Sequence, residues 1–308
     1  MKSDILLTRR QALITGASLP LAAASATPAL AAAEMQGAYT PAFSRFTLGD
    51  FEITTLLAGT TIAGDVQGIF GTNVSSEEFA DVSARNFIPA DQTEFYFTPT
   101  LVNTGQDLIL FDTGLNAAQL IQALNASGYT AEQIDVVVIT HMHFDHIGGL
   151  MADGTPTFPN ARYVTGSVEY NHWNGAEDAA FESNVRPLAE KMSFLEDGGS
   201  VAPGITAVAA FGHTPGHMAF MIESQGQSVL LFGDTANHYV WSLGYPDWEV
   251  RFDMDKTAAA TTRRRLLDML ASDRIPFIGY HMPFPALGYV ERRDSGFRYV
   301  PASYQFRL

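Results

Sequence analysis

The chain has 308 residues, contains no cysteine and is strongly acidic. It has 18 Lys and Arg residues against 33 Asp and Glu residues, which gives a formal net charge of −15 at pH 7. An acidic surface repels nucleic-acid phosphates, so we expect no nucleic-acid partner, and the absence of cysteine excludes disulfide bonds.

Residues 1–33 have the composition of an export signal. Arg9 and Arg10 precede an uncharged, Ala-rich stretch with small-residue cleavage sites at 29–31 and 31–33. The arginine pair resembles a twin-arginine signal. A membrane anchor is the alternative, which Gly16, Pro20 and Pro28 disfavour. We therefore expect cleavage near Ala31 to Ala33, a periplasmic or secreted protein without stable membrane association after processing, and one domain over residues 34–308.

The first half of this domain is predicted to be rich in strands. Residues 44–58 alternate apolar and polar side chains around Gly49-Asp50, as a hairpin does. Residues 59–95 are polar, with a weak helical pattern over 75–85. Strands at 99–104 and 107–112 follow, and then a helix over 116–126 and a buried strand over 134–139.

The second half continues the alternation of strands and helices that is typical of α/β domains. A strand at 161–164 and a helix over 167–174 precede a stretch, 175–203, that has no clear pattern. Strands are expected near 205–211, 217–223, 228–233 and 275–280. A helix over 256–272 should turn Leu266, Leu267 and Leu270 inward and expose the arginines at 263–265.

Four residues of metal-binding types follow the strand at 134–139 within six positions. They are His141, His143, Asp145 and His146. Histidine and aspartate are ligands of zinc and similar metals. One tetrahedral ion cannot use four side chains so close in sequence, but two neighbouring ions can, with His141 and His143 facing one and Asp145 and His146 the other. The alternative is a solvated His-rich loop, which this clustering disfavours.

Other ligand types follow other predicted strands. The segment Gly-His-Thr-Pro-Gly-His occupies 212–217, Asp234 ends a strand at 228–233, and His281 follows the strand at 275–280. Together with the first cluster, these motifs resemble the metallo-β-lactamase superfamily of dinuclear metallohydrolases. The resemblance implies a four-layer αββα sandwich and two divalent metal ions, with zinc expected. It also implies that His217, Asp234 and His281 complete the ligands, and that Asp234 bridges the metals. We interpret His213 as a turn histidine.

Further segments at 49–53, 101–105, 112–114, 226–227 and 296–301 resemble the subgroup that contains methyl parathion hydrolase and lies close to the lactonases. This implies hydrolysis of neutral lactones or aryl esters by a hydroxide shared between the metals. Hydrolysis of organophosphate triesters is an alternative. Iron-dependent oxygen or sulfur chemistry on the same fold is an alternative of another class, and a non-enzymatic metal-binding protein is a third.

Individual roles follow from this interpretation. Asp145 and Asp234 are the candidate catalytic carboxylates, and Asp145 can orient the nucleophile and carry a proton to the leaving group. Asp112 can hold a ligand histidine through its other ring nitrogen, or it is simply a turn residue. Substrate contacts are expected from Phe97, Trp173, Phe181, His238 and Tyr239, with core packing as the alternative. With no cationic clamp predicted, the substrate should be small, neutral and apolar. A homodimer is compatible with the sequence.

Overall fold

The computed structural model describes residues 34–307. The chain divides into two units, residues 1–39 and residues 40–308. Residues 34–39 of the first unit contain no helix or strand. The expected export signal, residues 1–33, lies outside the described residues. Among the described residues, no helix combines the length and the apolar character that a bilayer crossing requires.

The first sheet of the second unit has seven strands in the order β1-β2-β5-β6-β7-β10-β11. Strand β6 pairs in parallel with β7, which pairs in parallel with β10, so the carboxyl ends of these strands meet at one edge of the sheet. The strand bounds are β1 Phe43–Leu48, β2 Phe51–Leu56, β5 Thr100–Asn103, β6 Leu108–Phe111, β7 Val136–Ile139, β10 Arg162–Gly166 and β11 Met192–Leu195.

The second sheet also has seven strands, in the sequential order β12 to β18. Its neighbouring strands are antiparallel, except that β15 and β16 are parallel. The strand bounds are β12 Ser200–Ala202, β13 Ile205–Ala209, β14 Met218–Ser224, β15 Gln227–Gly233, β16 Phe277–Gly279, β17 Leu287–Arg293 and β18 Gly296–Pro301.

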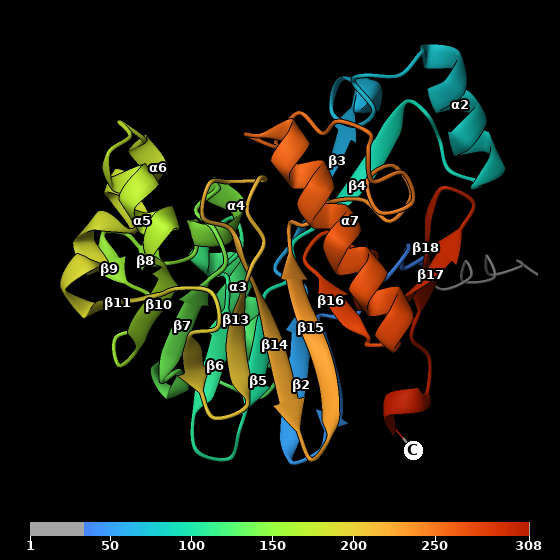
Figure 1. Cartoon of the computed structure of the whole chain (residues 1–308). Coiled ribbons are helices and arrows are strands. Elements are labelled where there is room, and N and C mark those ends of the chain that lie inside the picture. The colour runs from blue at the N-terminus through green and yellow to red at the C-terminus, as the bar shows by residue number, and fades with distance from the viewer. Residues whose placement is uncertain (1–33, 308) are drawn as a thin grey trace, which may run out of the picture. The chain divides into compact units, whose positions relative to one another are not determined.

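The two sheets pack face to face, and helices cover their outer faces (Figure 1). Alternate residues of a strand point to opposite faces. Val136 and Val138 of β7 therefore join the core between the sheets, whereas Val137 and Ile139 pack against the helices on the other side. The expected αββα sandwich is confirmed. The helix bounds are α2 Ser76–Arg85, α3 Ala117–Ala126, α4 Phe144–Ile147, α5 Ser167–Asn174, α6 Ala179–Asn184 and α7 Lys256–Asp273.

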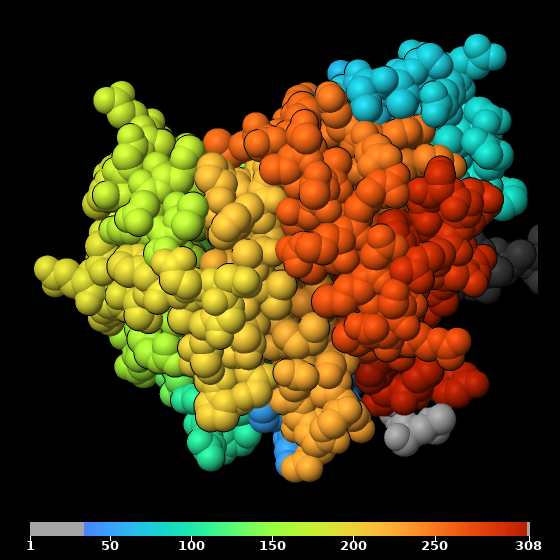
Figure 2. All heavy atoms as spheres, viewed as in Figure 1, coloured from blue at the N-terminus to red at the C-terminus, as the bar shows by residue number. Residues whose placement is uncertain are grey.

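Helix α7 covers the second sheet, and its orange surface lies between the yellow surface of residues near 200 and the red C-terminal strands (Figure 2). Leu266, Leu267 and Leu270 are buried as expected. The expectation that Arg263 is exposed is wrong, because only 1% of it is accessible. Its guanidinium donates to Asp253 Oδ2 at 2.6 Å and to the carbonyl oxygen of Thr235 at 2.8 Å. These partners compensate for burying the charge.

A two-stranded ribbon that the sequence did not reveal lies beside the sandwich. Its strands are β3 (Thr60–Gly64) and β4 (Gln92–Tyr96), with α2 between them in the sequence. Most residues of β3 are exposed, so this strand lacks the apolar alternation of a half-buried strand. A shorter ribbon joins β8 (Met151–Ala152) and β9 (Thr155–Pro156). The unassigned stretch 175–203 contains α6, β11 and β12.

Candidate metal centre

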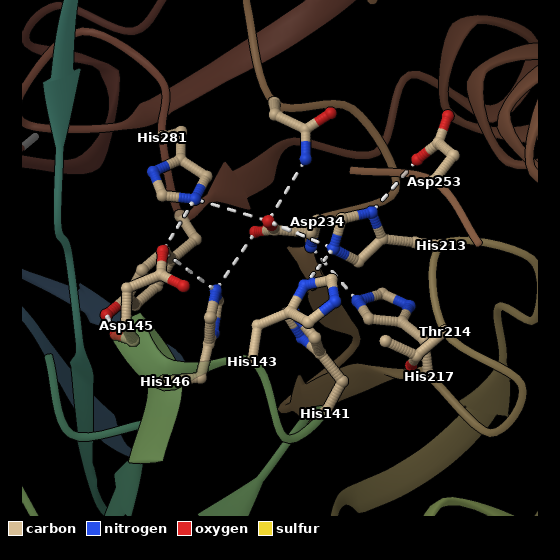
Figure 3. A network of polar contacts seen from close by, with 12 residues as sticks. His141, His143, Asp145, His146, His213, Thr214, His217, Asp234, Asp253 and His281 are labelled. Atoms are coloured by element: carbon tan, nitrogen blue, oxygen red, sulfur yellow. Dashed lines mark hydrogen bonds and ion pairs between the residues drawn. The ribbon is translucent and has the colours of Figure 1, made fainter. Parts of the chain in front are cut away.

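Seven histidine and aspartate side chains meet where the loops leave the two sheets (Figure 3). The loop after β7 supplies four of them, and α4 begins within that loop. The second sheet supplies the other three, from the loop between β13 and β14 and from the ends of β15 and β16. The seven residues are His141, His143, Asp145, His146, His213, Asp234 and His281.

One group of ligand atoms consists of three imidazoles. Nδ1 of His143 lies 3.2 Å from Nε2 of His141 and 2.9 Å from Nε2 of His213. Nε2 of His213 is also 3.4 Å from Oδ2 of Asp234. Three imidazole nitrogens and a carboxylate oxygen form a donor set that suits a tetrahedral zinc-type ion. We call His141, His143 and His213 the first ligand set.

A second group lies on the other side of Asp234. Nε2 of His281 is 3.2 Å from Oδ2 of Asp145 and 3.2 Å from Oδ2 of Asp234. Nε2 of His146 is 3.3 Å from Oδ1 of Asp234 and 3.6 Å from Oδ2 of Asp145. We call Asp145, His146 and His281 the second ligand set. Asp234 contacts both sets, which is the position expected of a bridging carboxylate.

The charges of these groups are strongly perturbed. Burial holds the pKa of His141 well below its usual value and lowers the pKa of His143 to about 3. Burial also lowers the pKa of His281, but the carboxylates of Asp234 and Asp145 outweigh it and raise the pKa to about 10. Burial raises the pKa of Asp234, but His281 and His146 hold it well below the usual range. The metal-free centre therefore keeps ionised carboxylates beside the neutral imidazoles of His141 and His143, whereas His281 must lose a proton before it can bind a metal.

Two buried atoms of the cluster support a metal-binding role. Within the described part of the chain, Nε2 of His146 and Oδ1 of Asp234 have no hydrogen-bond partner. Buried polar atoms normally have partners, so such a pair in one cluster calls for an explanation. The two atoms face each other at 3.3 Å inside the cluster (Figure 3). The donor types and these two atoms fit two divalent metal ions.

The structure corrects the expected roles of His213 and His217. Nδ1 of His217 is 3.1 Å from the carbonyl oxygen of Ala210, and its Nε2 accepts a hydrogen bond from the backbone N–H of Asp234 at 3.0 Å. Both ring nitrogens of His217 are thus occupied by the backbone. Nε2 of His213 instead reaches the first ligand set. The geometry therefore assigns the ligand position to His213 and a structural position to His217.

Carboxylates outside the cluster orient two of the histidines. Oδ2 of Asp112 lies 2.9 Å from Nδ1 of His146, which is the contact expected from the sequence. Oδ1 of Asp253 lies 2.9 Å from Nδ1 of His213. Such partners fix the tautomer and the orientation of a ligand histidine. The sequence analysis missed Asp253, because it lies 40 residues after His213 and follows no strand pattern.

The ligand cluster opens into a cavity of about 450 Å³. Most of its other lining residues are apolar, and they include Phe97, together with Phe95, Ile69 and Phe252, so a substrate contact by Phe97 stays a prediction. The exposed side chain of Arg251 also lines this cavity. The backbone N–H of Arg251 donates to the carbonyl oxygen of Ile69 at 2.7 Å, which places this cation at the wall, and the absence of a cationic clamp on the substrate stays a prediction.

The other expected substrate contacts have different surroundings. The ring of Trp173 packs edge-on to His143, with the ring centres 5.9 Å apart. Phe181 is fully buried and packs against Tyr170 in the core between the first sheet and its helices. Its expected contact with substrate is therefore wrong. His238 and Tyr239 line a separate cavity of about 370 Å³, which shares His281 with the first cavity. His238 and Tyr239 therefore do not line the cavity into which the ligand cluster opens.

Comparisons with known proteins show similar sequences and a shared fold. An N-acyl homoserine lactonase from Bacillus sp. is 27% identical over 164 residues, which are 53% of this chain and 62% of the relative. This chain therefore spans less than two thirds of the length of the curated relatives that it matches. Two solved structures share the fold with a TM-score of 0.79 and 24% identity. One is AidC, a dizinc quorum-quenching lactonase (85% of this chain and 98% of that chain), and the other is the hydrolase AbOPH (87% and 100%).

The family model of the metallo-beta-lactamase superfamily matches residues 98–276, which is more than half of the chain. This segment contains six of the seven clustered side chains. The chain therefore belongs to the metallo-beta-lactamase superfamily.

Proposed function

We propose that this protein is a dinuclear metal-dependent hydrolase that opens lactones with an apolar acyl chain. The observation that carries the proposal is the sharing of Asp234 between two ligand sets that face an apolar cavity. The similarity to N-acyl homoserine lactonases supports a lactone as the substrate. Aryl esters contain the same acyl–oxygen bond and are proposed as further substrates.

Two divalent metal ions bound here would polarise the substrate carbonyl and lower the pKa of a water molecule, so that hydroxide is available near neutral pH. The ligand residues have two further tasks. Asp234 contacts both ligand sets and so fixes their positions relative to each other, and it accepts a hydrogen bond from Nδ2 of Asn237 at 3.0 Å. Asp145 lines the cavity with 23% of its side chain exposed, so its carboxylate can receive a proton and pass it to the departing alkoxide.

The cavity walls fit the apolar part of such a substrate. Phe95, Phe97, Ile69 and Phe252 provide apolar surface that an acyl chain can cover, at about 25 cal/mol per Å² removed from water. Arg251 lies on the same wall, where it can donate to a carbonyl oxygen or carboxylate of the substrate. The pocket therefore favours substrates that combine an apolar chain with one hydrogen-bond acceptor.

The proposal is tested with the mature chain, residues 34–308, loaded in turn with Zn²⁺, Mn²⁺, Co²⁺ and Fe²⁺. The substrates are N-acyl lactones of increasing chain length, a p-nitrophenyl ester, a paraoxon-type triester and a cephalosporin. We expect the highest kcat/KM for lactones and a rise with acyl length. Metal-stripped protein is the control. A triester preferred over every lactone would replace the proposal with phosphotriesterase activity. Oxygen consumption by the Fe²⁺-loaded protein, without hydrolysis of any of these substrates, would replace it with iron-dependent oxygen chemistry.

We also propose that the protein is exported and acts outside the cytoplasm after cleavage near Ala31 to Ala33. This proposal rests on the arginine pair and the Ala-rich stretch in residues 1–33. Lactones are small neutral molecules that reach such a compartment without a carrier, which is consistent with the proposed substrate. The export test is described in the Discussion.

A further inference from the structure

A fully buried carboxylate, that of Glu169, joins the two loops that carry the first ligand set. Glu169 lies in the first turn of α5, and none of its surface is accessible. Burying a carboxylate is costly unless hydrogen bonds compensate it. Its four donors are all neutral groups: two backbone N–H groups, one hydroxyl and one indole N–H.

The first pair of bonds reaches the loop after β7. Oε1 of Glu169 accepts the backbone N–H of Met142 at 2.9 Å. Met142 stands between His141 and His143 in the sequence, so this bond fixes the backbone from which both ligands project. The same oxygen accepts the indole N–H of Trp173 at 2.7 Å, and the Trp173 ring packs edge-on against His143.

The second pair of bonds reaches the loop between β13 and β14. Oε2 of Glu169 accepts the hydroxyl of Thr214 at 2.7 Å and the backbone N–H of Gly216 at 2.9 Å. Thr214 directly follows His213, the third member of the first ligand set. A Cβ atom on Gly216 would lie 2.1 Å from the backbone nitrogen of Glu169, so this loop packs directly on the start of α5.

The second ligand set depends on other partners. Asp112 contacts Nδ1 of His146, and the carbonyl oxygen of Tyr96 accepts from Nδ1 of His281 at 2.8 Å. Glu169 therefore bonds to Met142 and Thr214, which are the direct sequence neighbours of the three first-set histidines, and to no direct neighbour of a residue in the second set.

We propose that Glu169 is a positioning residue that sets the geometry of His141, His143 and His213 and so controls the affinity of the first metal relative to the second. The proposal rests on the proposed function only in requiring that both ligand sets bind metal. It does not depend on the substrate. Removing an outer partner of a ligand typically weakens metal binding by about 10- to 100-fold.

The test variant is Glu169→Gln, whose amide group cannot accept the hydrogen bonds that one carboxylate oxygen now accepts. Metal-free protein is titrated with Zn²⁺ against a competing chelator, and zinc anomalous scattering from crystals grown at limiting zinc gives the occupancy of each ligand set. We expect the affinity of the first set to fall roughly 10- to 100-fold, with the second set unchanged within about twofold. Glu182→Gln on α6 is the matched control, because Glu182 is exposed and pairs only with Arg186 among the described residues.

A purely structural role for Glu169 predicts a different result. Both metal affinities would then fall together with the Tm of the metal-free protein, and this outcome, or no change in either affinity, overturns the proposal. If Glu169→Gln does not fold, Thr214→Val removes one donor and leaves the carboxylate in place. It should weaken the first set in the same direction by a smaller factor. Failure of lactone hydrolysis with two bound zinc ions would contradict the proposed function and leave the metal titration interpretable. Wild-type protein that binds no zinc at the first set would overturn both.

Discussion

Nδ1 of His213 lies 2.9 Å from Oδ1 of Asp253, whose other oxygen accepts a hydrogen bond from Arg263 at 2.6 Å. Asp253 and Arg263 are each 1% or less exposed at the side chain. A metal-ligand candidate is thus connected to helix α7 through a buried ion pair. The hydrogen bond from His213 to Asp253 and the ion pair from Asp253 to Arg263 thus connect the first ligand set to the outer helical layer of the fold.

Exchange of His213 and His217 for alanine should separate a ligand from a structural residue. His213→Ala removes a member of the first ligand set, so the protein should lose about one zinc equivalent and most of its turnover. His217→Ala leaves backbone partners unsatisfied and should cost roughly 1–3 kcal/mol of stability while two zinc ions remain bound. Elemental analysis and urea denaturation of both variants measure these effects. Equal loss of metal from both variants would contradict the assignment.

Breaking the Asp253–Arg263 pair should destabilise the fold strongly. Asp253→Asn leaves the Arg263 guanidinium buried without its counter-charge, which typically costs about 3–5 kcal/mol. The double variant Asp253→Asn/Arg263→Met removes both charges and should recover part of that loss. The exposed pair Asp247–Arg264, whose arginine also lies on α7, is the control, and Asp247→Asn should cost at most about 1 kcal/mol. Chemical denaturation of the four proteins tests this, and equal losses at the two pairs would refute it.

Zinc binding should release protons below pH 10. The pKa of His281 in the metal-free protein is about 10, above the ordinary value of 6.5. Protonation therefore stabilises the metal-free fold fully below about pH 6.5, and this contribution is lost as the pH rises through 10. Because a ligand histidine must be neutral, apparent zinc affinity should rise with pH over this range. Calorimetry in buffers of different ionisation enthalpy counts the protons. No proton release at pH 7.5 would contradict the pKa of His281.

Replacing Arg251 by methionine should change substrate binding more than catalysis. The side chain lies on the cavity wall, so we expect it to contact a bound substrate in the ground state and in the transition state alike. One lost hydrogen bond of about 0.5–1.5 kcal/mol corresponds to a roughly two- to tenfold rise in KM. Steady-state kinetics with acyl lactones that carry or lack an amide carbonyl measure the effect. Arg85→Met on α2 is the control. A fall in kcat with constant KM would show that Arg251 acts in the chemical step.

Export should depend on the two N-terminal arginines. The double variant Arg9→Lys/Arg10→Lys should leave the uncleaved precursor in the cytoplasm, because twin-arginine signals require the arginine pair. Hydrolysis by the purified variant should be unchanged. Immunoblots of cytoplasmic, membrane and periplasmic fractions test this. Normal secretion of the double variant would indicate the general export route, and accumulation in the membrane would indicate an anchor.

Local patterns predicted most of the sandwich. The helices expected over 75–85, 116–126 and 256–272 are present as α2, α3 and α7, with bounds that differ by no more than one residue. The ligand cluster after β7 was predictable because His141 to His146 are contiguous and follow a strand. The ribbon of β3 and β4 was missed, because its strands are 27 residues apart and largely polar.

Tertiary contacts decided the remaining assignments. His213 and His217 lie in one short segment, and only the backbone partners of His217 show which of the two rings faces the cluster. Arg263 lies three and four positions before Leu266 and Leu267, which places it on the inward helical face. The spacing of Arg263 from these two leucines was therefore enough to predict that Arg263 is buried. Phe181 lies in the stretch without a clear pattern, so its burial and its contact with Tyr170 were not readable from the sequence.

The origin of the ligands in two separate sheets has a consequence for biogenesis. The chain up to β11 supplies His141, His143, Asp145 and His146, whereas His213, Asp234 and His281 come from the later sheet. Neither half alone contains a complete ligand set. A nascent chain therefore cannot form either set until the later sheet has been synthesised and has docked on the earlier one. Acquisition of two metal ions would thus mark completed folding, and a quality-control step could distinguish finished molecules from truncated ones by metal content alone.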